Sequence, residues 1–170
     1  MRIDLEKLDE NGGRFAEVYQ PTQLQFDDEV QLVAPVSVEG RARREKQAAE
    51  LRGRLRTRVS VACGRCLKRV ELPIDVEFDE RFVTAIGWRD ETQHELAEEE
   101  LNLSVFDGEG IELDDLVKEE ILLALPAQPL CVAECRGLCP VCGADRNGED
   151  CQCAAAQTDS RWDKLKDLRS

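Results

Sequence analysis

The sequence contains a single histidine, His94, and this scarcity limits the catalytic chemistry that it can support. A Ser-His-Asp or Cys-His site would have to use that one imidazole, which lies in the acidic stretch QHELAEEE, far in sequence from every cysteine. A catalytic zinc ion usually has histidine or a carboxylate among its ligands and keeps one open position. No glycine-rich phosphate loop occurs in the sequence either. The sequence therefore predicts a protein that is not an enzyme, with His94 as a solvated loop residue.

Long hydrophobic runs are also missing. The first residues, MRIDLEKL, already carry four charged side chains, and no apolar run elsewhere has the roughly 20 residues that a membrane-spanning helix needs. We therefore expect no signal segment, no membrane partner and no small-molecule substrate, and we predict a cytoplasmic protein. In that reducing compartment disulfides do not persist, so clustered cysteines indicate metal ligands first and redox groups second.

Positive charge is scarce overall but concentrated in one region. The net charge of −13 argues against general binding to phosphate backbones. Residues 41–69 nevertheless contain eleven Lys or Arg and two Glu, whereas residues 90–120 contain thirteen Asp or Glu and one Lys. The sequence predicts a basic surface inside an acidic protein, and the acidic residues 87–112, which contain Gly87, Gly108 and Gly110, are typical of a mobile loop or linker.

Apolar and polar residues alternate in three segments, which is typical of strands with one buried face. These segments are residues 29–42, 51–63 and 70–78. The CGRC sequence at 63–66 is then the expected tip of a hairpin, and Pro73 indicates an edge position for the strand that follows.

Four arginines alternate with the apolar residues of the second segment, and we call them the arginine comb. They are Arg52, Arg54, Arg56 and Arg58. Because they share the face opposite to the apolar set, they are the candidate contact surface for RNA or for an acidic partner protein. An ordinary solvated strand face is the alternative.

Helical signals occur in two places. ELDDLVKEEILLALP predicts a helix with Asp114 and Asp115 near its amino end and Pro126 after its last turn. TDSRWDKL predicts a short helix that contains Trp162. We therefore expect an α+β protein with a mainly antiparallel sheet and one long helix. Residues 1–125 are predicted to form a mainly β domain with the basic hairpin and the terminal helix, and residues 126–170 a Cys-rich zinc module that ends in the short helix.

Six of the eight cysteines lie between residues 131 and 153. A CxxC pair closes a tight turn whose two sulfurs converge on one tetrahedral ion. CPVCG followed by CQC therefore predicts a structural Zn²⁺ site with the ligands Cys139, Cys142, Cys151 and Cys153. The other four cysteines allow a second zinc site, although the middle cysteines could exchange between the two: Cys63, Cys66, Cys131 and Cys135.

A bound metal ion would also stabilise residues 131–153. Apart from cysteine, residues 131–153 contain only five apolar side chains, which cannot offset the entropy of ordering that much backbone. A structural zinc ion contributes roughly 10 to 16 kcal/mol of apparent free energy. Cations beside the thiolates should help, and the nearby ones are Arg65, Lys68, Arg136 and Arg146. A disulfide framework and a thiol-exchange enzyme are the rival readings; the first needs an oxidising compartment and the second a CxxC that opens a helix.

The order of these pieces resembles the YceD family, described as large-subunit ribosomal RNA accumulation proteins. The resemblance rests on CGRCL, LALPAQPLC, CRGLCPVCG, CQC and DSRWDKL, and covers the chain from about residue 30 to residue 168. It implies a non-enzymatic cytosolic protein that is needed for accumulation of 23S ribosomal RNA. Some members of the family lack the later cysteine cluster, so the resemblance implies that zinc is structural here.

The partner that this resemblance implies is large-subunit ribosomal RNA or a ribosomal protein. In the first hypothesis the arginine comb contacts RNA phosphates. In the second the chain is a zinc-ribbon adaptor that binds another protein and never contacts RNA.

Overall fold

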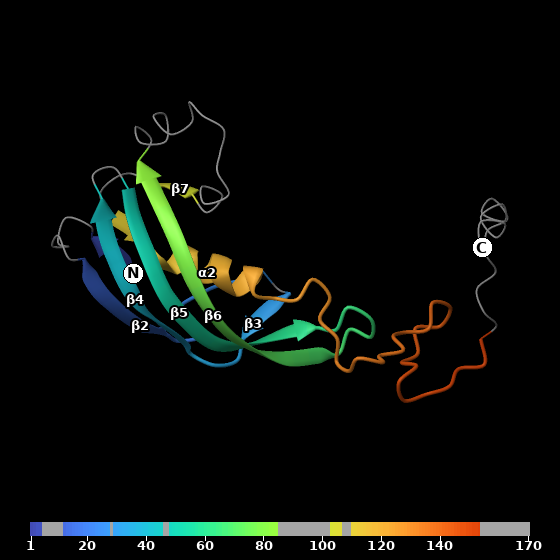
Figure 1. Ribbon diagram of the computed structural model, residues 1–170. Helices are drawn as coiled ribbons and strands as arrows, with labels where there is room; N and C mark the ends of the chain where they lie inside the picture. The colour runs from blue at the N-terminus through green and yellow to red at the C-terminus, as the bar shows by residue number, and fades with distance from the viewer. Residues whose placement is uncertain (5–11, 28, 46–47, 85–102, 107–109, 154–170) are drawn as a thin grey trace, which may run out of the picture.

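A six-stranded sheet is the largest element of the described chain (Figure 1). The structure is a computed structural model, and it describes residues 1–4, 12–27, 29–45, 48–84, 103–106 and 110–153. The strands of this sheet are β2 Gly13–Tyr19, β3 Val30–Leu32, β4 Val36–Glu45, β5 Ala48–Ala62, β6 Arg69–Thr84 and β7 Leu103–Phe106. Their order is β2-β4-β5-β6-β7, and β3 pairs with β5 beyond the end of β4. Only the β6–β7 pair is parallel.

The two longest strands, β5 and β6, form one hairpin. Their register runs without interruption from Ala48 opposite Val83 to Ala62 opposite Arg69. This confirms the predicted hairpin with CGRC at its tip. Beyond β5, the described strands pair with β6 only at 81–84, so Pro73 lies on a strand edge, as predicted.

The predicted strand at 29–42 is divided in the structure. Both β3 and β4 pair with β5, but the register changes by two residues between Val30 opposite Val61 and Val38 opposite Leu55. The two extra residues are taken up between the strands, where Pro35 has no N–H to donate to a ladder. Alternation of apolar residues continues through this break, which is why the pattern alone did not reveal it.

The inner face of the sheet carries the hydrophobic core. One row across four strands places Phe15 of β2 opposite Gly40 of β4, and Gly53 of β5 opposite Phe78 of β6, with the two glycines opposite each other. A Cβ atom on Gly53 would lie 2.6 Å from the Phe78 ring and 2.5 Å from the carbonyl oxygen of Glu39. The two rings therefore occupy space that glycine leaves open.

A single described helix, α2 (Leu113–Leu123), covers part of the core. It follows directly on a small antiparallel ladder of β1 (Arg2–Asp4) and β8 (Gly110–Glu112). Its buried residues Leu116, Val117 and Ile121 pack with the apolar faces of the strands. Among the described residues no helix is long and apolar enough to cross a bilayer.

The prediction of an α+β fold with one long helix is wrong, because the described part of the chain is mostly β, with 51% of the described residues in strands. The helix has 11 residues. At its start, β8 holds Glu112 in extended conformation, and at its end Pro126 disfavours helical conformation at the preceding residue. Only the residues between these two limits are free to become helical.

Two predictions fall outside the described residues: the loop assignment of His94 and the helix around Trp162. The loop predicted at 87–112 is wrong at residues 103–106 and 110–112, which form the strands β7 and β8, and its other residues lie outside the described part of the chain. From 126 to 153 the chain has no named strand or helix and one isolated bridge, Leu138 with Asp145. The domain boundary at residue 125 stays a prediction.

Tyr19 joins the edge strand β2 to the start of helix α2. Its hydroxyl donates a hydrogen bond to Asp114 Oδ1 at 2.8 Å, and the side chain is buried. Burial first, and then the hydrogen bond to the Asp114 carboxylate, raises the pKa of Tyr19 above its ordinary value.

Replacing Tyr19 by Phe is expected to lower the free energy of unfolding by about 1 to 2 kcal/mol, because a hydrogen bond to a carboxylate is lost. The unfolded chain ionises Tyr19 near pH 10, whereas the folded chain keeps it neutral to higher pH. The wild-type advantage is therefore complete below about pH 10 and declines above it. Urea unfolding of both proteins near pH 7 and near pH 11 measures this difference; equal differences at the two pH values would contradict it.

Candidate metal centres

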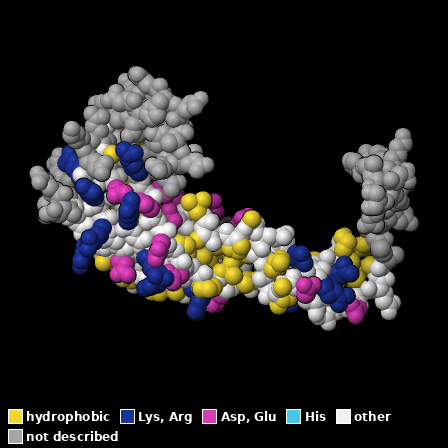
Figure 2. Space-filling view, in the orientation of Figure 1, with side chains coloured by type: hydrophobic (Ala, Val, Ile, Leu, Met, Phe, Trp, Pro, Cys, Tyr) yellow, Lys and Arg dark blue, Asp and Glu magenta, His cyan; other side chains and the backbone are white. Residues whose placement is uncertain are grey.

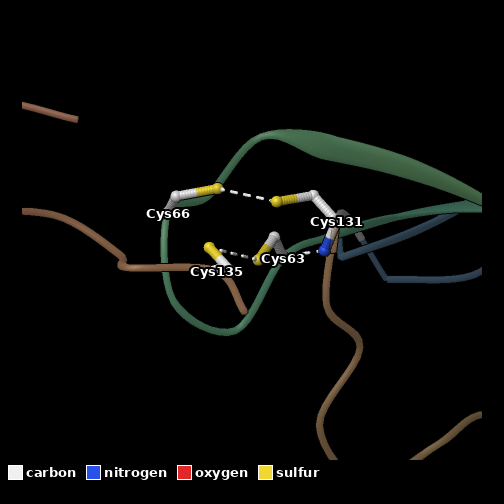
Figure 3. A group of neighbouring side chains, drawn as sticks. All are labelled: Cys63, Cys66, Cys131 and Cys135. Atoms are coloured by element: carbon white, nitrogen blue, oxygen red, sulfur yellow. Dashed lines mark hydrogen bonds between the residues drawn. The ribbon is translucent and has the colours of Figure 1, made fainter. Parts of the chain in front are cut away.

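The hairpin tip and the segment after helix α2 bring four cysteines together (Figure 3). Cys63 and Cys66 come from the tip, and Cys131 and Cys135 from the segment that follows Pro126. All four sulfurs lie within 4.8 Å of one another. We call this group the hairpin quartet.

The spacing of these sulfurs fits a tetrahedral zinc ion. The Cys63 and Cys135 sulfurs are 3.8 Å apart, and those of Cys66 and Cys131 are 3.5 Å apart. Four sulfurs at about 2.3 Å from a central ion lie about 3.8 Å from one another. A disulfide would need about 2.0 Å, and all eight cysteines are free thiols. The geometry suits a shared metal and not a pair of disulfides.

A second group, the distal quartet, lies entirely within the carboxyl-terminal segment. It consists of Cys139, Cys142, Cys151 and Cys153, whose sulfurs also lie within 4.8 Å of one another. Cys139 is buried and Cys142 is exposed, so this group is more open to solvent than the hairpin quartet. The two quartets divide the cysteines as the spacing predicts, and their use as metal sites stays a prediction.

The same backbone turn is built twice, once in each quartet. Cys63 N–H donates to the Lys68 carbonyl at 2.8 Å, and Leu67 N–H donates to the Cys63 carbonyl at 3.0 Å. The corresponding bonds join Cys139 to Ala144 at 2.8 Å and Gly143 to Cys139 at 2.9 Å. This repetition indicates that the two CxxC sequences form equivalent turns.

The residue after each CxxC has a left-handed backbone. Leu67 has a φ of 62° and Gly143 a φ of 75°. Glycine adopts this conformation freely, whereas for a leucine it costs roughly 1 to 2 kcal/mol. Leu67 is held there by the hairpin, which is the kind of local strain that a binding site requires.

Backbone amides of the turns point at the first sulfur of each CxxC. The N–H groups of Arg65 and Cys66 lower the pKa of the Cys63 thiol to about 6. The N–H groups of Cys142 and Val141 likewise lower the pKa of Cys139 to about 6. Amides that stabilise a thiolate are what a zinc ligand needs, because the metal binds the thiolate and not the thiol.

Contacts with neighbouring thiols shift the pKa of Cys131 and Cys153 in the opposite direction. Contact with the Cys135 side chain, followed by Cys66, raises the pKa of Cys131 to about 12. Contact with Cys142 raises the pKa of Cys153 to about 12. Sulfurs this close cannot all carry a negative charge without a cation between them. A divalent ion would supply that charge, so the residues present fit a bound Zn²⁺ in each quartet.

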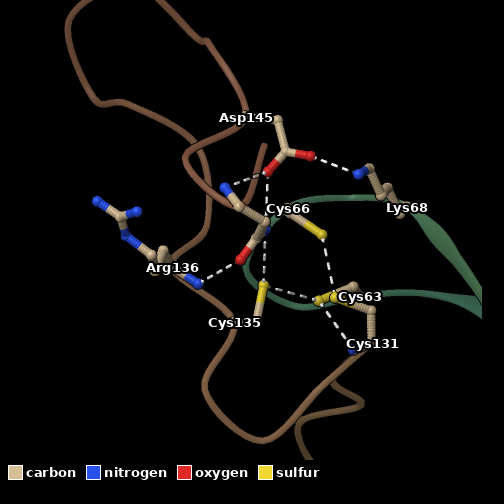
Figure 4. Close-up of polar contacts among 8 residues, drawn as sticks. Cys63, Cys66, Lys68, Cys131, Cys135, Arg136 and Asp145 are labelled. Carbon is tan, nitrogen blue, oxygen red and sulfur yellow. Dashed lines mark hydrogen bonds and ion pairs between the residues drawn. The ribbon is translucent and has the colours of Figure 1, made fainter. Parts of the chain in front are cut away.

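Asn147 connects the two quartets. Its side-chain nitrogen donates to Cys135 Sγ at 3.4 Å, and its side-chain oxygen accepts from the Arg136 N–H at 2.7 Å. The same nitrogen lies 2.7 Å from Asp145 Oδ1, and Lys68 Nζ lies 2.5 Å from Asp145 Oδ2 (Figure 4). Lys68, first among the causes, lowers the pKa of Asp145 to about 2. The loop between the distal ligands is therefore fastened to the hairpin tip.

Sequence reasoning missed this role of Asn147 and looked to basic side chains instead. Among the described residues, no Lys or Arg side chain donates a hydrogen bond to a cysteine sulfur. Arg65 donates to the Cys135 carbonyl at 2.8 Å, and Arg136 pairs with Asp150 at 3.1 Å. These cations support the backbone around the sulfurs, while backbone amides and Asn147 contact the sulfurs themselves.

Replacing Asn147 by Ala is expected to weaken zinc binding at the hairpin quartet by about 10- to 100-fold, as is typical when a group that orients a metal ligand is lost. Competition with a chromophoric chelator measures the two affinities. Arg146→Ala is the matched control, because Arg146 neighbours Asn147 and its side chain makes no hydrogen bond or ion pair with the described residues. Equal zinc affinities in the wild type and in Asn147→Ala would contradict a role of Asn147 in orienting Cys135.

The arginine comb lies opposite a row of carboxylates on β6. Arg54 forms two hydrogen bonds with Asp75, at 2.6 and 2.8 Å, and Arg52 forms one with Asp79 at 3.0 Å. Arg56 lies 3.4 Å from Asp75 and Arg58 3.8 Å from Glu71, and the comb also pairs Arg54 with Glu77 at 3.6 Å and Arg52 with Glu50 at 2.5 Å. Arg54, first among the causes, lowers the pKa of the Asp75 carboxyl. Each comb arginine thus faces a carboxylate, and contact of the comb with RNA stays a prediction.

Comparison with known proteins gives relatives in bacteria. A family model for the large ribosomal RNA subunit accumulation protein YceD matches residues 51–169. An uncharacterized protein of Mycobacterium tuberculosis is 34% identical over 106 residues, which are 62% of this chain and 48% of that protein. The chain thus spans about half the length of its mycobacterial relatives, and a protein of Mycobacterium bovis gives the same figures.

A more distant relative is the uncharacterized protein YlbN of Bacillus subtilis, 24% identical over 143 residues, which are 83% of this chain and 78% of that protein. No solved structure is significantly similar to the chain. The family match includes the basic hairpin and all eight cysteines. Since it extends over most of the sequence, the chain belongs to the YceD family of large ribosomal RNA subunit accumulation proteins.

Proposed function

We propose that this chain is a non-enzymatic factor in the biogenesis of the large ribosomal subunit, needed for accumulation of 23S ribosomal RNA, and that its cysteines hold two structural zinc ions. The family match over residues 51–169 supports the role in RNA accumulation. Work on ribosomal RNA would place the chain in the cytoplasm.

The observation that carries the structural role of zinc is the closed ligand set of each quartet. Four sulfurs around one Zn²⁺ complete a tetrahedron and leave no position for water or substrate. Zinc bound in this way supplies folding free energy and no Lewis-acid chemistry at an open position. The hairpin quartet would fasten the segment from 126 onward to the sheet, and the distal quartet would fold residues 139–153.

Depletion of the chain in its native host tests the proposed function. The ratio of large-subunit to small-subunit ribosomal RNA is expected to fall on depletion and to recover with the wild-type gene. A gene with Cys63→Ser and Cys66→Ser is expected to restore it incompletely, because the segment after the helix is no longer held. An unchanged ratio in depleted cells would disprove the role in RNA accumulation.

Exposed apolar side chains favour a second candidate, a zinc-ribbon adaptor that binds a protein such as a ribosomal protein. Leu67 is 65% exposed, Val132 57% and Val141 60%, and all three lie beside quartet ligands. A contiguous exposed apolar patch is typical of protein contacts, and this candidate treats the three side chains as parts of one contact surface. Crosslinking in cells, with and without ribonuclease, separates the candidates: an adaptor keeps its partners after RNA is digested.

A further inference from the structure

Three arginines at one end of the outer sheet face differ from the comb in their surroundings. Arg14 lies on β2, and Arg41 and Arg43 lie on β4; we call them the edge arginines. All three are exposed, and among the described residues no ion pair or side-chain hydrogen bond involves them. In a protein of net charge −13 they offer positive charge that no described residue engages in an ion pair. Figure 2 shows Lys and Arg gathered at the end of the sheet away from the cysteine segment.

The register places these side chains together. Arg14 lies directly opposite Arg41, and Arg41 directly opposite Arg52 of the comb. Adjacent strands are about 4.8 Å apart and alternate residues of a strand about 6.7 Å apart, so the edge arginines fit within about 10 Å. A shallow hollow of about 440 Å³ lies between Arg14 and Arg41, floored by Ala16 and Gly40.

Among the described residues, two carboxylates lie near the edge arginines, and one of them already forms an ion pair. Glu50, opposite Arg43, pairs with Arg52 at 2.5 Å. Glu39, two residues before Arg41, lies opposite Arg54 and also lines the hollow. Within the described part of the chain, three arginines without ion-pair partners on neighbouring strands thus lie beside two carboxylates. A guanidinium group is planar and binds a phosphate through two parallel hydrogen bonds, so such a row suits a phosphate backbone.

We infer that the edge arginines, and not the comb, form the surface through which the chain binds phosphates of large-subunit ribosomal RNA. This inference rests on the proposed function, which supplies the RNA. The comb arginines form ion pairs with carboxylates on β6, and the edge arginines make the salt-sensitive contacts with RNA phosphates.

Binding to a fluorescein-labelled transcript of a large-subunit ribosomal RNA domain tests the inference. The triple variant R14Q, R41Q and R43Q is expected to bind at least about tenfold more weakly. Its dependence of log affinity on log salt should be shallower by about 2, which is the slope that three phosphate contacts contribute on single-stranded RNA. The variant R14K, R41K and R43K should keep most of that slope, since it retains the charges.

Two controls separate the edge arginines from other sources of charge. The variant R69Q, K118Q and R146Q removes the same net charge at remote positions, and the variant R54Q with D75N removes one comb pair without changing net charge. Both should bind within about twofold of the wild type, and thermal unfolding should show that every variant is folded. Loss of affinity equal to that of the edge triple in either control, or no loss in the edge triple, would overturn the inference. Absence of salt-sensitive RNA binding by the wild type would also overturn it.

Depletion and complementation in cells distinguish a failure of this inference from a failure of the proposed function. If depletion lowers large-subunit RNA and the edge triple restores it fully, the function stands and the RNA surface is elsewhere. If depletion leaves the RNA unchanged, the proposed function itself fails.

Discussion

Replacing Cys63 and Cys66 by Ser is expected to lower the zinc content from two ions per chain to one and to release the segment after helix α2 from the hairpin tip. Among the described residues, and apart from contacts of the cysteine sulfurs, four bonds join the tip to the segment. Gly64 N–H donates to the Pro129 carbonyl at 2.8 Å and Leu138 N–H to the Arg65 carbonyl at 3.1 Å, while Arg65 donates to the Cys135 carbonyl at 2.8 Å and Lys68 pairs with Asp145 at 2.5 Å. Such bonds contribute about 0.5 to 1.5 kcal/mol each, which in sum is less than the roughly 10 to 16 kcal/mol of a structural zinc ion. Native mass spectrometry gives the metal content, and hydrogen exchange at Gly64 and Leu138 reports the release.

The matched variant carries Cys139→Ser and Cys142→Ser. It should also bind one zinc ion, but its Gly64 amide should stay protected, because the hairpin quartet is intact. The two variants therefore differ in which part of the chain exchanges and not in metal content. Wild-type protein purified anaerobically without bound metal, yet with protected Gly64 and Leu138 amides, would contradict the zinc proposal for both quartets.

Replacing Gly53 by Val is expected to lower the free energy of unfolding by about 3 kcal/mol or more, a large share of the 5 to 15 kcal/mol that stabilises a typical domain. Its Cβ would lie 2.5 Å from the Glu39 carbonyl oxygen and 2.6 Å from the Phe78 ring. The ring can move, but the carbonyl belongs to the β4 backbone. Replacing the Phe78 ring by the smaller Leu side chain, in the double variant Gly53→Val and Phe78→Leu, should therefore recover only part of the lost free energy of unfolding.

Gly148 is the matched control for this variant. No atom lies within 4 Å of the Cβ position at Gly148, so Gly148→Val should change the free energy of unfolding by less than about 0.5 kcal/mol. Urea unfolding of the zinc-loaded wild type and of these three variants measures the free energies of unfolding. If Gly53→Val lowers the free energy of unfolding by less than about 1 kcal/mol, the prediction is contradicted, and β4 and β5 move apart easily at Gly53.

The sequence predicts features that depend on neighbouring strands of one hairpin. The position of CGRC fixes the tip, and from there the register follows: Arg54 faces Glu77 and Arg56 faces Asp75. The acidic row on β6 could have been derived in this way, because its carboxylates alternate with apolar residues just as the comb does. The pattern of β5 alone, without its partner strand β6, does not predict the ion pairs of the comb.

Other features depend on contacts that local patterns do not determine. Pairing of β2 with β4 brings Arg14 beside Arg41, although 26 residues separate them and nothing in either segment specifies the partner. The bond from Asn147 to Cys135 likewise depends on the turn of the distal quartet. Helix α2 begins at Leu113, within one residue of its predicted start, and ends at Leu123, so its length was overestimated at the carboxyl end.

The two quartets close loops of very different size, and this determines the order in which zinc can be loaded. The distal ligands lie within 15 residues of sequence, from Cys139 to Cys153, whereas the hairpin ligands extend over 73, from Cys63 to Cys135. On loop length alone, closing the longer loop costs about 1.4 kcal/mol more. The distal ion can therefore be captured by a short stretch of newly made chain, while the hairpin ion has to wait until β5 and β6 have paired. Under zinc shortage, a half-loaded intermediate with metal only at its carboxyl-terminal end should accumulate.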